Sequence, residues 1–85
     1  MPKKITRPNL NDAGIEKAML DARNHFLNKL RKKKNGALIS PHETYGIVAE
    51  EVYELLMALH QNNDKEFKQE LLDIATACLF GYASL

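Results

Sequence analysis

The chain has 85 residues, a formal net charge of +1 and one cysteine. This length predicts one small domain with a thin core, so partner chains are an expected source of further buried surface. The single Cys78 excludes an internal disulfide framework and is expected to be a small buried hydrophobe in a reducing cytoplasm. No apolar stretch reaches the roughly 20 residues that a membrane span needs, so we expect a soluble cytoplasmic protein without a membrane partner.

The two halves of the sequence differ sharply in charge. Residues 1–39 contain ten Lys or Arg and three Asp or Glu, whereas residues 40–85 contain two lysines and eight acidic residues. A basic half of this kind can bind nucleic acid, bind a phosphorylated small molecule, or pack against the acidic half. Nucleic acid is the least favoured partner, because packing against the acidic half explains the basic half without it.

Residues 1–8 are predicted to form a flexible arm ahead of a single all-α domain over residues 9–85. From about Asn9 or Asn11, apolar residues recur at three- and four-residue steps, as in an amphipathic helix. Asn9 is the expected N-cap, and Asn35-Gly36 is the expected stop after a run of basic residues. The apolar stripe of this helix consists of Ile15, Ala18, Met19, Ala22, Phe26 and Leu30.

Two further helices are predicted, joined by a short polar turn. Ser40, a following proline and Glu43 at the third helical position form a capping box, and this helix should run to about His60. Asn63 or Asp64 caps the next helix. The apolar stripes are Val48, Val52, Leu55, Leu56 and Leu59 in the first helix, and Phe67, Leu71, Ile74, Ala75, Cys78 and Tyr82 in the second. We therefore expect an all-α, three-helix protomer with an αα-hairpin, whose chains pair into a four-helix-bundle core.

Two pairs of acidic residues have matched spacing: Glu51 with Glu54, and Glu70 with Asp73. Three positions along a helix place both carboxylates one turn apart on the same face. At roughly 100° per residue, each pair falls at the edge of its apolar stripe, where adjacent helices can share a cation. Converging carboxylates repel one another unless a cation lies between them, and Mg²⁺ prefers oxygen ligands. The alternative is a solvated acidic face, since Glu is a good helix former.

The order Glu-x-x-Glu, spacer, Glu-x-x-Asp resembles the signature of the MazG-like all-α nucleoside triphosphate pyrophosphohydrolases, in particular a short phage- or mobile-element-type branch. The resemblance covers about residues 40–80. It implies hydrolysis of a nucleoside triphosphate substrate to the monophosphate and pyrophosphate, with Mg²⁺ or Mn²⁺ as cofactor, by a homodimer or homotetramer. It also implies Glu50 as a water-activating base or second-metal ligand, and a set of metal ligands consisting of Glu51, Glu54, Glu70 and Asp73.

The chain differs from the family pattern in its basic residues. Family members often have a basic residue one turn before the first acid, where this sequence has Ile47, and further basic residues after the second motif. Phosphate binding is therefore expected from Lys29, Lys32 and Lys33, in the same or a neighbouring chain. The alternative is that these lysines complement the helix dipole. Tyr53 is a candidate for contact with the base, although a core edge is the commoner place for tyrosine.

The function predicted from these features is Mg²⁺-dependent pyrophosphate release that removes unwanted nucleotides. The alternative is a MazG-like nucleotide-binding or helical scaffold module without catalysis. His25 and His60 are too isolated in the sequence to indicate a zinc site.

Overall fold

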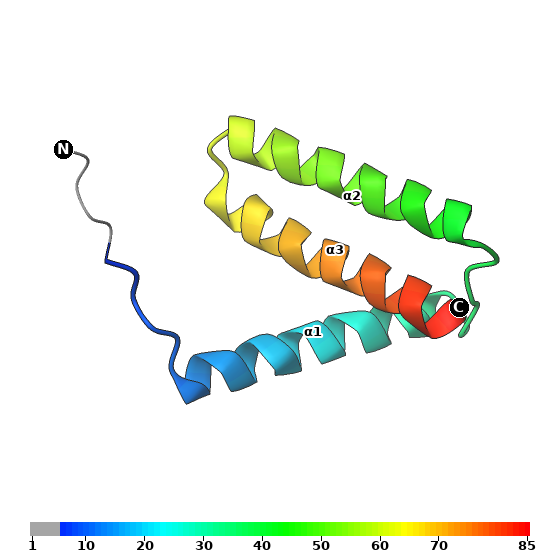
Figure 1. Ribbon diagram of the computed structural model, residues 1–85, viewed down its shortest axis with the longest axis horizontal. Helices are drawn as coiled ribbons and strands as arrows, with labels where there is room; N and C mark the ends of the chain where they lie inside the picture. The colour runs from blue at the N-terminus through cyan, green and yellow to red at the C-terminus, as the bar shows by residue number, and fades with distance from the viewer. Residues whose placement is uncertain (1–5) are drawn as a thin grey trace.

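The computed structural model describes residues 6–85, and all regular structure within them is helical (Figure 1). Helix α1 spans Asp12–Lys32, α2 spans Pro41–His60 and α3 spans Asp64–Ser84. The all-α class and the three-helix protomer are thereby confirmed. The predicted arm over residues 1–8 lies mostly outside the described residues. None of the three helices contains a segment apolar and long enough to cross a bilayer.

An asparagine lies near each end of helix α1. The side chain of Asn11 accepts a hydrogen bond of 2.7 Å from the backbone N–H of Gly14, so Asn11 is the N-cap and the expectation of Asn9 is wrong. At the other end, Lys34 and Asn35 have φ values of 53° and 61°. Asparagine tolerates this left-handed conformation better than most residues, so it turns the chain out of the helix as predicted.

Helix α2 begins at the predicted cap. Ser40 Oγ accepts from the Glu43 N–H at 3.1 Å, and Glu43 Oε1 accepts from the Ile39 N–H at 3.2 Å. The glutamate therefore reaches one residue further back than in the usual capping box, where it would contact the N-cap residue itself. These two bonds satisfy backbone donors that have no partner inside the helix.

A three-residue turn joins α2 to α3. Asn62 takes a φ of 53°, and the N–H of Asn63 donates to the carbonyl of Ala58 at 3.1 Å. A hydrogen bond to the carbonyl five residues earlier, together with a residue in the left-handed conformation, is a Schellman motif at the C-terminus of α2. Because the side chain of Asn63 also caps α3, the chain reverses at once and the two helices form the predicted hairpin.

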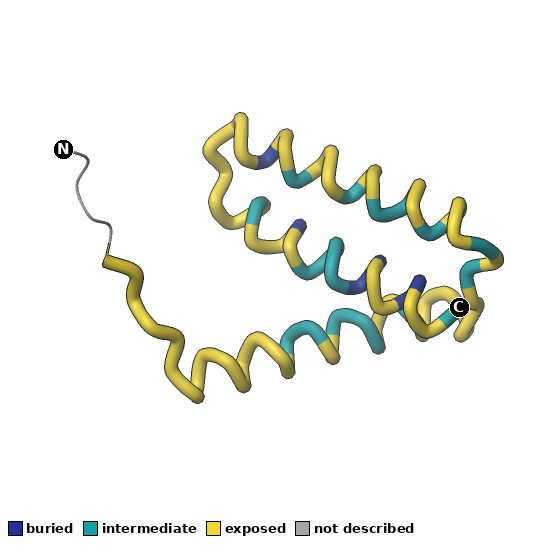
Figure 2. The backbone as a smooth tube through the Cα atoms, viewed as in Figure 1, coloured by how far each residue is buried: buried dark blue, intermediate teal, exposed yellow. Residues whose placement is uncertain are grey.

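Helix α3 lies between the other two helices, and α1 and α2 each pack on α3 but not on each other (Figure 1). Only the C-terminal half of α1 takes part, because residues 12–20 are exposed while the half-buried positions begin at Asp21 (Figure 2). The rings of Phe26 and Phe80 meet at a centroid distance of 5.0 Å in this interface. The fold thus consists of a well-joined hairpin and a first helix attached along part of its length.

The core is smaller than the apolar stripes predicted. Its buried hydrophobic residues are Ala58, Ala77 and Phe80. Burial was also expected for Ile15, Ala18, Met19, Val52, Leu56, Leu59, Leu71, Cys78 and Tyr82, all of which are exposed. These expectations, including the buried Cys78, are wrong for the single chain, because each outer helix is covered by α3 along one narrow side only.

Candidate metal centre

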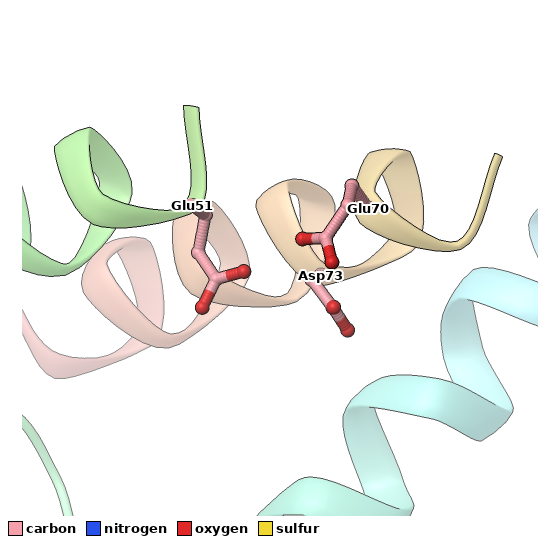
Figure 3. A group of neighbouring side chains, drawn as sticks. All are labelled: Glu51, Glu70 and Asp73. Carbon is pink, nitrogen blue, oxygen red and sulfur yellow. The ribbon is translucent and has the colours of Figure 1, made fainter. Parts of the chain in front are cut away.

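Three carboxylates converge where α2 faces α3. Glu51 comes from α2, and Glu70 and Asp73 come from successive turns of α3 (Figure 3). One carboxylate oxygen from each lies within 4.8 Å of the others. Glu70 is 6% exposed, and Glu51 and Asp73 are half-buried. The structure therefore brings together three of the four acids that the sequence motif selected.

Burial and the crowding of carboxylates raise the pKa values of two of these acids. The pKa of Glu70 is raised from its ordinary 4.5 to about 8, mainly by burial and in addition by the carboxyl of Glu66 and the negative charges of the neighbouring acids. Burial also raises the pKa of Glu51, with the charges of Glu54 and Asp73 as additional causes. One oxygen of Glu51 and one of Glu70 are buried without any hydrogen-bond partner. An unpartnered buried carboxylate oxygen is costly unless a proton or a cation occupies it.

This donor set fits a hard divalent cation. Oxygen is the ligand type that Mg²⁺ and Mn²⁺ prefer, and three carboxylates leave coordination positions for water or phosphate oxygens. A cation would satisfy the two unpartnered oxygens of Glu51 and Glu70 and offset the mutual repulsion of the cluster. The residues present therefore suit a metal centre, while the preference for Mg²⁺ among hard cations rests on the family resemblance.

The fourth acid of the motif occupies a different position. Glu54 is exposed and lines a second hollow at the α2–α3 turn with Glu66 and Glu70, and its negative charge contributes to the raised pKa of Glu51. Glu50 is exposed on α2 and stands outside the three-carboxylate group. Tyr53 is 62% exposed. Side chains one position before or two after Glu51 point away from α3 because successive helical residues turn by about 100°.

A cavity of about 80 Å³ adjoins the acid cluster. Its charged lining residues are Glu51 and Asp73 of the hairpin, Lys29 of α1, and Lys33, the C-cap residue of α1. The remaining lining residues are Leu38, Ile47, Thr76, Ala77 and Phe80. Lys29 and Lys33 share a face of α1 because they are four residues apart, whereas Lys32 is exposed and does not line the cavity.

Two polar residues at this site were not selected from the sequence. His25 Nε2 lies 2.6 Å from Asp73 Oδ1, and Thr76 is 5% exposed with no hydrogen-bond partner for its hydroxyl. A signal for His25 was present, since His25, Lys29 and Lys33 follow one another at four-residue intervals and so share one helix face. Thr76 likewise follows Asp73 by three residues on α3.

Comparison with known proteins gives no relative from which a role could be transferred. The chain matches no protein-family model, no curated protein and no solved structure. The resemblance to the MazG-like enzymes therefore stays a prediction from the motif, and the site stands on its own geometry, which is an acid cluster suited to a divalent cation beside a cavity lined by two lysines.

Proposed function

We propose that this protein is a Mg²⁺-dependent nucleoside triphosphate pyrophosphohydrolase, which converts a (d)NTP and water to the (d)NMP and pyrophosphate and so clears unwanted nucleotides from the cytoplasm. The observation that carries the proposal is that acidic and basic residues, Glu51 and Asp73 with Lys29 and Lys33, line the same cavity. A nucleoside triphosphate binds as a polyphosphate with its divalent cation, so its site needs carboxylates and cationic side chains together. The unpartnered, buried oxygen of Glu70 supports the cation half.

This hydrolysis requires a bound polyphosphate, a water molecule positioned for attack and a group that accepts its proton. Mg²⁺, when bound, supplies charge neutralisation on the phosphate oxygens. Lys29 and Lys33 bind the β- and γ-phosphates, which keeps the α-phosphorus near the acids. The water oxygen bonds to that phosphorus as its bond to the bridging oxygen breaks and pyrophosphate leaves. Glu51 lines the cavity and exposed Glu50 does not, so Glu51 is the better placed carboxylate to accept the proton of the water.

The test is product release by the purified protein. With Mg²⁺ and a panel of ribo- and deoxyribonucleoside triphosphates, pyrophosphate and monophosphate should appear in equal amounts by ³¹P NMR. Glu70→Gln and Asp73→Asn should each lower kcat/KM by more than about a hundredfold, because loss of a ligand should exceed the 10–100-fold effects seen for residues behind the ligands. Glu50→Gln is the matched control and should keep most of the activity. Absence of turnover for every nucleotide contradicts the proposal.

A second candidate function is nucleotide binding without catalysis. It is favoured by the position of Glu50, which stands outside the acid cluster, and by the size of the cavity, which at about 80 Å³ is below the roughly 300 Å³ of common ligand pockets. A binding module would show a Mg²⁺-dependent rise in Tm with a nucleoside triphosphate and no product. Product formation at a rate that depends on Asp73 eliminates this candidate.

We also propose that the protein works as a homodimer or homotetramer with a four-helix core. Its accessible surface is 7439 Å², whereas a compact monomer of this mass exposes about 5,100 Å². Part of this excess comes from the exposed residues 6–20, and part comes from apolar side chains that a neighbouring chain could cover. Val52, Leu56 and Leu59 form an exposed apolar stripe on α2 that can supply such an interface.

The oligomer is tested by molar mass in solution. Light scattering after size exclusion should give at least twice the 9.7 kDa of the chain. Leu56→Glu places a charge in the exposed stripe and should lower the measured mass, whereas Lys65→Glu, at an exposed polar position of α3, should leave it unchanged. A monomer at all concentrations rules out this part of the proposal.

A further inference from the structure

One contact joins the first helix directly to the acid cluster. His25 Nε2 and Asp73 Oδ1 are 2.6 Å apart, and the two side chains are 18% and 19% exposed. When Asp73 is ionised, its carboxylate only accepts hydrogen bonds, and His25 Nε2–H is then the donor. The second oxygen of Asp73 and the remaining lone pairs of the first stay available to a cation, because a carboxylate offers about four acceptor positions.

The contact between His25 and Asp73 also attaches α1 to the hairpin. Among residues 6–85, it is the single hydrogen bond between side chains that connects α1 with the hairpin. Phe80 makes two further contacts near this interface, because its ring packs on Phe26 and lies 5.3 Å from Lys33 Nζ. With residues 12–20 exposed, α1 depends on a short interface for its position. Losing one polar contact from such an interface should move the docking equilibrium measurably.

We propose that His25 is a positioning residue that couples metal binding at the acid cluster to the docking of helix α1. The inference rests on the proposed function in one respect, which is that a divalent cation binds Glu51, Glu70 and Asp73. His25 and the cation use the same orientation of the Asp73 carboxylate, in which Oδ1 contacts His25 Nε2 and the carboxylate takes part in the acid cluster. When two partners stabilise the same conformation of a shared group, each raises the affinity of that group for the other, and the two effects are equal.

The coupling extends to the lysines of the cavity. His25, Lys29 and Lys33 lie at four-residue intervals on α1, so a helix held in place by His25 also places both lysines beside the cavity. We expect removal of the cation to leave Asp73 less fixed through repulsion among the acids, and so to weaken its contact with His25 and the docking of α1. Metal binding at the acid cluster therefore also favours the position of α1 in which both lysines line the cavity.

The experiment titrates the full-length protein with Mn²⁺ alone, followed by electron paramagnetic resonance, and maps hydrogen exchange with and without Mg²⁺. His25→Leu removes the donor at similar volume, and His25→Gln keeps an N–H donor. His42→Leu changes an exposed histidine at the start of α2 and is the matched control. We expect Mn²⁺ affinity to fall about tenfold in His25→Leu and to stay within about threefold of the parent in His25→Gln and His42→Leu.

Hydrogen exchange gives the readout that a general loss of stability would not reproduce. In the parent protein and in His25→Gln, Mg²⁺ should slow exchange across residues 21–32 of α1, and in His25→Leu it should slow exchange in the hairpin but not in α1. Parental affinity together with metal-induced slowing of α1 in His25→Leu overturns the coupling while leaving the metal centre intact. If the parent binds no Mn²⁺, the metal centre and the coupling both fall. If His25→Leu fails to fold, unchanged exchange of α1 on adding Mg²⁺ to the parent is sufficient to refute the coupling.

Discussion

The α2–α3 hairpin and helix α1 are held by different means, although each is built from helices of about the same length. The hairpin is joined by a three-residue turn and by close backbone approach, since a Cβ at Gly81 would overlap the methyl group of Thr44. Helix α1 is joined to the hairpin by a short interface around Phe80 and by the contact of His25 with Asp73.

The hairpin and helix α1 contribute different side chains to the candidate site. The hairpin contributes the three carboxylates, whose relative positions follow from a tight turn and two packed helices. Helix α1 contributes Lys29 and Lys33, whose position depends on the weaker attachment. The carboxylates that would bind the cation thus belong to the firmly packed hairpin. The lysines that would bind phosphate depend on helix α1, whose attachment is weaker.

The largest expected change comes from pH and lies in the hairpin. Glu70 has a folded-state pKa of about 8 against an ordinary 4.5, so between these values the unfolded chain loses a proton that the folded chain keeps. The free energy of unfolding should therefore fall as pH rises from 4.5 to 8, at up to about 1.4 kcal/mol per pH unit. Urea unfolding at several pH values measures the slope. Glu70→Gln should flatten it, and Mg²⁺ should oppose it; equal slopes in parent and variant contradict the prediction.

The next effect tests the attachment of α1. Phe80 is 5% exposed and lies between α1 and the cavity, so Phe80→Ala should lower the free energy of unfolding by about 3 kcal/mol. Tyr82→Ala, at a side chain that is 88% exposed, should change it by less than about 0.5 kcal/mol. Urea denaturation followed by circular dichroism gives both values. Exchange of α1 amides should rise more than that of the hairpin in Phe80→Ala, and a uniform rise would remove the distinction between the two regions.

A pair of glycines tests the close packing inside the hairpin. Gly81→Ala should destabilise the protein by about 1–3 kcal/mol, because the added methyl group meets Thr44. Gly46→Ala has nothing within 4 Å of the added Cβ and should stabilise α2 by roughly 0.5–1 kcal/mol, since alanine is the better helix former. Thermal melts of the two variants should move in opposite directions. A stabilised Gly81→Ala would show that the helices do not approach as closely as described.

The smallest expected effect distinguishes basic residues that line the cavity from basic residues that lie outside it. Replacing Lys29 and Lys33 together by Met should weaken binding of inorganic pyrophosphate in the presence of Mg²⁺ by about tenfold, because two charged partners are removed from the cavity. Replacing Arg31 and Lys32 by Met removes the same charge from outside the cavity and should change the affinity by less than about twofold. Isothermal titration calorimetry distinguishes the two. Equal losses would indicate a general effect of charge in place of a cavity-specific one.

Local chemistry made much of the fold predictable. The helix starts at Ser40 and Asn63 follow from side chains that accept backbone hydrogen bonds, and such bonds need no tertiary context. The acid pairs were found for a similar reason, since residues three apart on a helix share a face in any helical fold. The start of α1 was missed by two residues because Asn9 and Asn11 are both chemically suitable caps and only the backbone conformation selects one.

The core was less predictable from the sequence, because a helical stripe identifies an apolar face but not the neighbour that covers it. Val52, Leu56 and Leu59 belong to such a stripe and lie exposed, while α3 covers a different side of α2 through Leu55 and Ala58. The burial of Glu70 was missed in the same way, since its position on the wheel does not reveal how closely α2 and α1 approach it.

The sequence by itself therefore determined three helices, the caps of α2 and α3, the hairpin and the pairing of acids on each helix, since all of these depend on interactions within a few residues. Only the tertiary structure decided which acids converge, that His25 meets Asp73, and that Lys29 and Lys33 lie by the cavity while Lys32 does not. These outcomes depend on the rotation and crossing of whole helices, which a short apolar interface sets and which no local spacing encodes.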